Sequence, residues 1–165
     1  MSRLLPKFLE EDVPCNTIMA KVALFTVQTF PLERKTFHIV MLVPEMDYDP
    51  EKYPDVPVRP HLFAEYTYGD RSTWKHDFAN IARHKALQLW HDRSDGSDSK
   101  AHLLFPGDTP HWGGVKRDGI AVACEGAGPH FDRMIASMIA DACIALADDA
   151  KVKWMRGHPN VDFLD

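Results

Sequence analysis

Lys85 is the residue whose type and position point most directly to ligand chemistry. In a helix expected over residues 74–90, steps of 100° place Lys85 in the middle of the apolar face. An ammonium group on such a face must reach solvent along its stem, pair with a carboxylate, or meet an anionic ligand. The pattern leaves structural pairing and ligand contact open. The apolar face consists of Trp74, Phe78, Ile81, Ala82 and Leu89.

A glycine-rich turn provides a second candidate for anion binding. The residues from Gly126 to Gly128 lie between an apolar segment and a helix expected to begin at Pro129. Backbone N–H groups and the positive end of a helix bind carboxylates and phosphates, so Gly126 and Gly128 are predicted ligand-binding residues. The alternative is a tight connection between strand and helix. The turn falls short of the dinucleotide-binding fingerprint, so it predicts no nucleotide site.

His111 and His130 are the histidines with candidate roles in metal or cofactor binding. His111 stands in a loop between Pro110 and Trp112, and His130 lies in the first turn of the last helix. A histidine near a positive helix end stays neutral more readily, and neutral imidazole ligates iron or accepts a proton. Solvation of both side chains is the alternative. Three further histidines share the polar face of the middle helix without zinc-helix spacing, namely His76, His84 and His91.

Acid–base chemistry is conceivable at Glu125 and Asp132, which flank the glycine-rich turn and could act as general acid or base if buried. The sequence contains no Gly-x-Ser-x-Gly elbow, no phosphate-binding loop and no paired-cysteine motif. Their absence argues against the common hydrolase, kinase and redox classes.

The elements that must position these residues follow from periodicity and from breaker residues. Residues 1–14 are expected as an irregular arm, and residues 149–165 as a weakly determined tail. Asn16 is the expected cap of a helix over residues 17–29, with a strand over residues 22–30 as the competing interpretation. The remaining expected elements are strand 36–43 closed by Pro44, proline-rich loop 44–60, strand 61–68, helix 74–90 capped by Ser72 or Thr73, edge strand 101–105, strands 115–117 and 120–124 joined by Asp118-Gly119, and helix 129–148.

Bulk composition restricts the class of protein. A length of 165 residues predicts a single domain, and 45% apolar with 26% charged residues is ordinary for a globular protein. The net charge of -5 argues against nucleic-acid binding, and no segment is typical of a membrane span or a signal peptide. Three cysteines without metal-ligand spacing favour a reducing, cytoplasmic location. The order of elements predicts an α/β (α+β) fold with a mostly antiparallel sheet flanked by helices.

Four segments in order resemble the GlcG/HbpS-type haem-binding family. They are residues 81–86, the step Gly113-Gly114-Val115, the strand of small residues from Gly119 to Gly126, and the helix containing Asp132. The resemblance spans roughly residues 36 to 148 and implies a profilin-like fold. It also implies haem or another tetrapyrrole as cofactor, with carboxylates near Lys85 and the 126–128 turn, and His111 or His130 as axial ligand.

The chain departs from that family at two places. A proline-rich loop replaces the usual short turn between the first two strands, and Glu125 stands where a serine usually precedes the glycine. Three hypotheses therefore remain. The first is a protein that binds a small anionic ligand of the haem-binding type. The second is an enzyme acting on a small carboxylate metabolite, with Lys85 orienting the substrate and Glu125 or a histidine moving a proton. The third is a homo-oligomeric assembly module that packs through Tyr48 and Tyr53.

Overall fold

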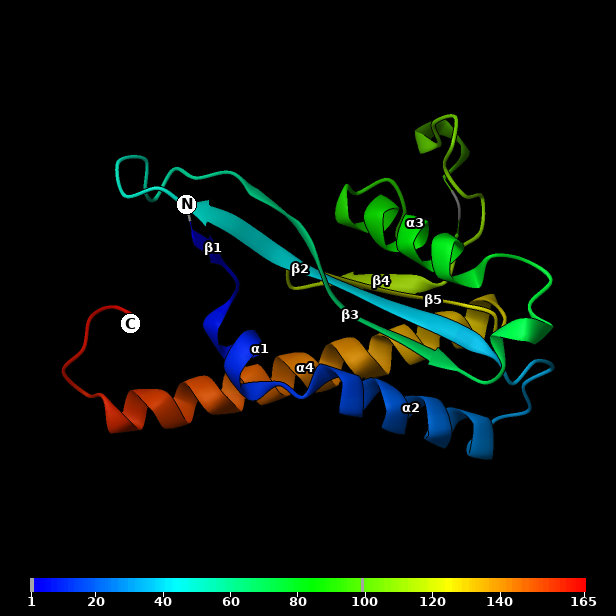
Figure 1. Cartoon of the computed structure of the whole chain (residues 1–165), viewed down its shortest axis with the longest axis horizontal. Helices are drawn as coiled ribbons and strands as arrows, with labels where there is room; N and C mark the ends of the chain where they lie inside the picture. The colour runs from blue at the N-terminus through cyan, green and yellow to red at the C-terminus, as the bar shows by residue number, and fades with distance from the viewer. Residues whose placement is uncertain (1, 99) are drawn as a thin grey trace.

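A five-stranded antiparallel sheet forms the centre of the molecule (Figure 1), as seen in a computed structural model that describes residues 2–98 and 100–165. The central strand β2 (Phe37–Tyr48) pairs with β3 (Val58–Tyr68) on one side. On its other side it pairs with β5 (Ile120–Glu125) and, at its far end, with β1 (Ser2–Leu4). The strand β4 (Gly114–Arg117) pairs with β5. The arrangement confirms the predicted α+β class and is consistent with a profilin-like sheet.

Helices cover both faces of the sheet. Figure 1 shows α1 (Lys7–Asp12), α2 (Cys15–Thr29) and α4 (Pro129–Gly157) on one face, and α3 (Phe78–Trp90) on the other. Side chains of a strand alternate between faces, so β2 serves two cores. Phe37, Ile39 and Met41 belong to the larger core beside α2 and α4, whereas Val40 and Leu42 belong to the smaller core beneath α3.

The hairpin of β2 and β3 extends further than the sequence indicates. The strand β2 does not end at Pro44 as expected but continues to Tyr48, and Pro44 stands opposite Pro60 in β3. Proline is tolerated at strand positions where no ladder hydrogen bond requires its missing N–H. The irregular connection is therefore confined to residues 49–57, and the hairpin projects beyond the rest of the sheet (Figure 1).

Two predictions about helix boundaries were wrong. The helix α2 begins at Cys15, directly after Pro14, so Asn16 is not its cap, and the competing strand over residues 22–30 is absent. Asp77 caps α3 by accepting a hydrogen bond from the N–H of Asn80. A separate 3-10 turn occupies Arg71–Thr73, and Trp74 therefore lies outside the helix.

Three further segments differ from expectation. The first 14 residues were expected to be irregular, but they contain the strand β1 and the helix α1, which begins directly after Pro6. The expected edge strand over residues 101–105 is a 3-10 turn at Ala101–Leu103. The helix α4 continues beyond the expected end at residue 148, to Gly157. Among the described residues, none of the helices combines the length and apolar character needed to cross a membrane.

Candidate functional site

Lys85 lies in the core of the molecule, as its helical position predicted. Its side chain is 3% exposed, because α3 packs that face against the sheet. The ammonium donates a hydrogen bond to the carbonyl oxygen of Cys124 at 2.9 Å. It also forms ion pairs with the carboxylates of Glu125 and Asp132, the latter at 3.4 Å. The charge of Lys85 is thus matched by two protein carboxylates, and its role as a ligand contact stays a prediction.

Asp132 connects this ion cluster to the glycine-rich bend. Its Oδ1 accepts a hydrogen bond from the N–H of Ala127 at 2.9 Å, while Oδ2 faces Lys85. Burial raises the pKa of Asp132 from 3.8 to about 7, with Lys85 opposing the increase and Glu125 adding to it. Near neutral pH this carboxyl group therefore changes its protonation state easily, inside the protein and next to a lysine.

The loop before β4 closes the space around Lys85. Gly113 has a φ of 131°, and a Cβ placed on it would lie 2.6 Å from the Cβ of Asp132 and 3.4 Å from the Nζ of Lys85. The hollow beside Lys85 is too narrow to hold a water molecule. It is lined also by Gln88, His111 and Trp112. Only glycine permits this close approach of the backbone to the ion cluster.

The bend itself requires glycine at its first position. Gly126 has a φ of 122°, and a Cβ there would lie 2.6 Å from the carbonyl oxygen of Thr36 and 2.9 Å from the ring of Phe78. The carbonyl oxygen of Gly128 accepts a hydrogen bond from the N–H of Asp132 at 2.7 Å, and Pro129 occupies the first helical position as predicted. The bend is therefore a close-packed junction of strand and helix.

A cavity of about 290 Å³ is lined by the bend, and Lys85 is not among its lining residues. It brings together three of the five predicted ligand-binding residues, Gly126, Gly128 and His130, with an arginine that the sequence analysis did not single out, Arg34. Within the described part of the chain, Arg34 forms no ion pair, and its guanidinium lies 6.0 Å from the ring centroid of Phe78. The remaining lining residues are Pro31, Glu33, Ala127, Pro129 and Phe131.

The two predicted metal-binding histidines line different cavities. His130 is exposed at the cavity of Arg34, where its ring meets that of Trp112 edge-on at 5.2 Å. His111 lines a separate hollow of about 320 Å³ that it shares with His84 and Asp108. Residues 2–98 and 100–165 contain no group of three or more histidine, cysteine, aspartate or glutamate side chains placed to hold a metal ion.

His38 lies in β2 with a buried side chain, in an environment of structural contacts. Its ring lies 2.8 Å from the hydroxyl oxygen of Thr67 and 3.1 Å from a carboxylate oxygen of Glu65. Burial lowers the pKa of His38, with Glu65 opposing the decrease. Glu65 in turn accepts hydrogen bonds from Arg83 of α3, so these contacts tie α3 to β2 and β3.

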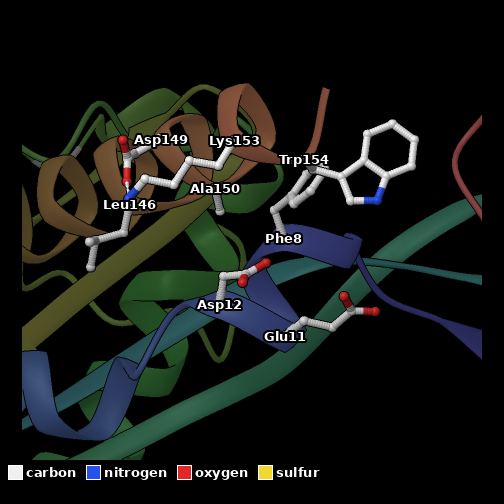
Figure 2. A pocket seen from close by; sticks show the side chains of 8 residues that line it. All are labelled: Phe8, Glu11, Asp12, Leu146, Asp149, Ala150, Lys153 and Trp154. Carbon is white, nitrogen blue, oxygen red and sulfur yellow. Dashed lines mark hydrogen bonds and ion pairs between the residues drawn. The ribbon is translucent and has the colours of Figure 1, made fainter. Parts of the chain in front are cut away.

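Two larger cavities lie away from the predicted residues. One, of about 440 Å³, lies between α1 and the distal half of α4. Figure 2 shows the rings of Phe8 and Trp154 close together at one end of this cavity. In the same view the carboxylates of Glu11 and Asp12 approach from α1, and Asp149 pairs with Lys153 on α4. The other, of about 690 Å³, is a mostly apolar groove between β1, the distal hairpin and the C-terminal residues.

Comparison of the chain with family models, with curated proteins and with solved structures finds no match. The resemblance to the haem-binding family therefore stays a prediction. Arg34 carries no signal in the sequence, because it lies in a short connection with other charged residues and its approach to the bend depends on the tertiary fold. Glu125 and Asp132 were recognised as flanking the bend, and the structure adds that both pair with Lys85.

Proposed function

We propose that this chain binds a small anionic ligand, bearing a carboxylate or phosphate group, in the cavity between Arg34 and the bend at residues 126–130. The observation that carries the proposal is the position of Arg34. Its guanidinium, without a carboxylate partner among the described residues, lines the same cavity as the N-terminal end of a 29-residue helix. A cation and a positive helix end at one cavity both favour an anion.

The first turn of α4 adds hydrogen-bond donors to this charge. Pro129 has no N–H group, but the N–H groups of His130 and Phe131 lie in the first turn, where no intrahelical acceptor exists for them. The side chain of His130 lines the same cavity. One acidic side chain, Glu33, also lines it and opposes anion binding, so it is expected to weaken the affinity and to disfavour ligands of high charge.

The size of the cavity narrows the class of ligand. About 290 Å³ lies at the lower end of the range of roughly 300–1,000 Å³ typical of ligand pockets. A small carboxylate or phosphate ester matches that volume better than a complete tetrapyrrole. Haem would place only its propionate groups there, with the macrocycle outside and His130 as the nearer of the two predicted axial ligands. Haem binding is thus a narrower proposal than anion binding.

The two alternative functions stay predictions. General acid or base catalysis by Asp132 needs a substrate at its carboxyl group, which Lys85, Ala127 and Gly113 surround. A substrate reaches that carboxyl group only if the loop before β4 moves. Homo-oligomeric assembly through the hairpin is compatible with the exposure of Tyr48 and Tyr53 near its tip.

Calorimetric titration at constant ionic strength tests the anion site, with inorganic phosphate and oxalate as probes. We expect saturable binding of at least one probe, roughly tenfold weaker in Arg34→Gln because a charged hydrogen bond is lost. Arg133→Gln is the matched control, since Arg133 is exposed on α4 and does not line the cavity. Glu33→Gln should strengthen binding. Equal affinities in the two arginine variants, or no binding to either probe, would refute the proposal.

A separate titration tests the tetrapyrrole proposal. Haem is added to the protein and the Soret band is followed, first with the natural chain and then with His130→Ala, His111→Ala and the double variant. A shift that disappears when His130 is replaced supports an axial role for that residue. A shift that survives in the double variant, or no shift at all, rules out both histidines as iron ligands and leaves the anion site to be judged by the calorimetry alone.

A further inference from the structure

Two cysteines far apart in the sequence meet in the larger core. Cys15 is the first residue of α2 and Cys143 lies within α4, and their Sγ atoms are 3.9 Å apart. The Sγ of Cys15 also donates a hydrogen bond to the Sδ of Met41 at 3.3 Å. The third cysteine, Cys124, lies in β5 and is fully buried.

The two sulfur atoms lie close enough for a small movement to bring them to bonding distance. The sulfur atoms of a disulfide are about 2.05 Å apart, so the pair must approach by roughly 2 Å. Rotation about the Cα–Cβ bonds moves both sulfur atoms on this scale. Cys143 is fully buried, but Cys15 is 6% exposed at the start of α2, so a small oxidant meets the pair from the side of Cys15.

The thiols also change each other's acidity. The hydrogen bond between the two thiols lowers the pKa of Cys143, with burial opposing the decrease. The same hydrogen bond, together with burial, raises the pKa of Cys15. Loss of one proton from the pair gives a thiolate, the nucleophilic form of cysteine, with an S–H group beside it.

We propose that Cys15 and Cys143 form a reversible intramolecular disulfide when the protein meets a peroxide. The thiolate of one of the two cysteines attacks one oxygen of hydrogen peroxide, the O–O bond breaks, and a sulfenic acid forms as hydroxide leaves. The sulfur of the other cysteine then attacks the sulfenic sulfur, and the S–O bond breaks to release a second hydroxide. The two thiol protons convert both hydroxides to water. In balance, the two thiols lose two electrons and the peroxide gains them.

The disulfide would connect the start of α2 to the middle of α4, between cysteines 128 positions apart in the chain. Such a bond restricts the unfolded chain, and a long closed loop gives a large effect in the chain-entropy account. The disulfide would also hold α2 against α4, and α2 leads directly into the connection that contains Arg34. The inference does not depend on anion binding, since neither cysteine lines the cavity of Arg34.

The test oxidises the reduced, folded full chain with a small excess of hydrogen peroxide. Alkylation under denaturing conditions should then find one free thiol in place of three, and mass spectrometry should find peptides containing Cys15 and Cys143 linked with the loss of two hydrogen atoms. The thermal midpoint should rise by about 5 °C or more, and dithiothreitol should reverse both changes. Non-reducing electrophoresis should show a monomeric chain.

Two variants keep the result interpretable. Cys15→Ser should retain its two remaining thiols and show no rise in thermal midpoint, whereas Cys124→Ser, the matched control, should lose both of its thiols and still give the linked peptides. Three unchanged thiols after oxidation would overturn the inference. So would a link that involves Cys124, a link between two chains, or a sulfinic acid as the stable product.

Discussion

The Nζ of Lys85 in α3 lies 3.4 Å from Oδ2 of Asp132 in α4, inside the molecule, although the two residues stand 47 positions apart along the chain. The same carboxylate accepts a hydrogen bond from the N–H of Ala127 in the bend. One buried ion pair therefore joins α3, the bend after β5 and the start of α4. Ala127 also lines the cavity of Arg34, so the shape of that cavity depends on the carboxylate that holds Ala127.

Replacement of Lys85 tests how strongly the ion cluster holds these elements. Lys85→Met leaves Glu125 and Asp132 without their cation, and removing one partner of a buried pair typically costs about 3–5 kcal/mol in the free energy of unfolding. Urea denaturation measures the loss. We expect a larger loss at pH 8 than at pH 5, because Asp132 can take up a proton at the lower pH and needs no cation.

A double-mutant cycle provides the control for this prediction. Asp132→Asn removes one of the two carboxylates, so Lys85→Met should cost less in that background than in the natural chain. A cost below about 1 kcal/mol for Lys85→Met alone, or equal costs in both backgrounds, would show that the cluster does not stabilise the fold in this way.

The parts of the fold that the sequence predicted share strong local patterns. The i, i+3, i+4 repeat placed Lys85 on the inner face of α3, and the run of small apolar residues identified β5 as a central strand. The turn that joins β4 to β5 consists of Asp118 and Gly119, and both residues have a positive φ. Each of these signals comes from residues adjacent in the chain, which is why the sequence alone indicates these elements.

The errors arose where tertiary contacts override local preference. The apolar residues between Ala101 and Phe105 suggest a strand, but a short apolar run has no period of its own, and no partner strand lies there within the described residues. The strand β2 passes through Pro44, which stands opposite Pro60 and pairs with neither β5 nor β1 on the other side of the strand. Arg34, and the proximity of Cys15 to Cys143, depend on how distant elements pack, and no spacing in the sequence indicates either.

Asp132 should give stability an unusual pH dependence. Its pKa in the folded state is about 7, above the ordinary value of 3.8, so between these values the folded state retains a proton that the unfolded state releases. The stability contributed by this group is present below pH 4 and is lost as pH rises towards 7. Asp132→Asn abolishes this titration. The free energy of unfolding of the variant, relative to the natural chain, should therefore rise by roughly 2 kcal/mol between pH 5 and 7.

Urea denaturation of both proteins across that pH range measures the difference. His38 contributes the opposite dependence, because its lowered pKa makes acid unfavourable to the folded state, but it is present in both proteins and cancels in the comparison. A difference that stays constant from pH 5 to 7 would show that Asp132 does not titrate there. A difference that changes in favour of the natural chain would show that its pKa is lowered instead.

Gly113 should be more sensitive to substitution than Gly107, another glycine with positive φ. Gly113→Ala introduces both the strain of a φ near 131° and a contact of 2.6 Å with the Cβ of Asp132. Gly107 has a φ of 93°, and a methyl group added there would meet nothing within 4 Å, so Gly107→Ala is a control for backbone strain alone. Strain of this kind costs roughly 1–3 kcal/mol, and forcing extra volume into a packed site typically adds another 1–3 kcal/mol.

We therefore expect Gly113→Ala to lose at least about 1 kcal/mol more in the free energy of unfolding than Gly107→Ala. The loss should be accompanied by a change at the ion cluster, because the added methyl group presses on Asp132 and lies 3.4 Å from the ammonium of Lys85. Amide exchange at Ala127, whose N–H depends on Asp132, reports that change directly. Equal losses in the two variants, with unchanged exchange at Ala127, would mean that the loop before β4 moves aside and does not rest firmly on the cluster.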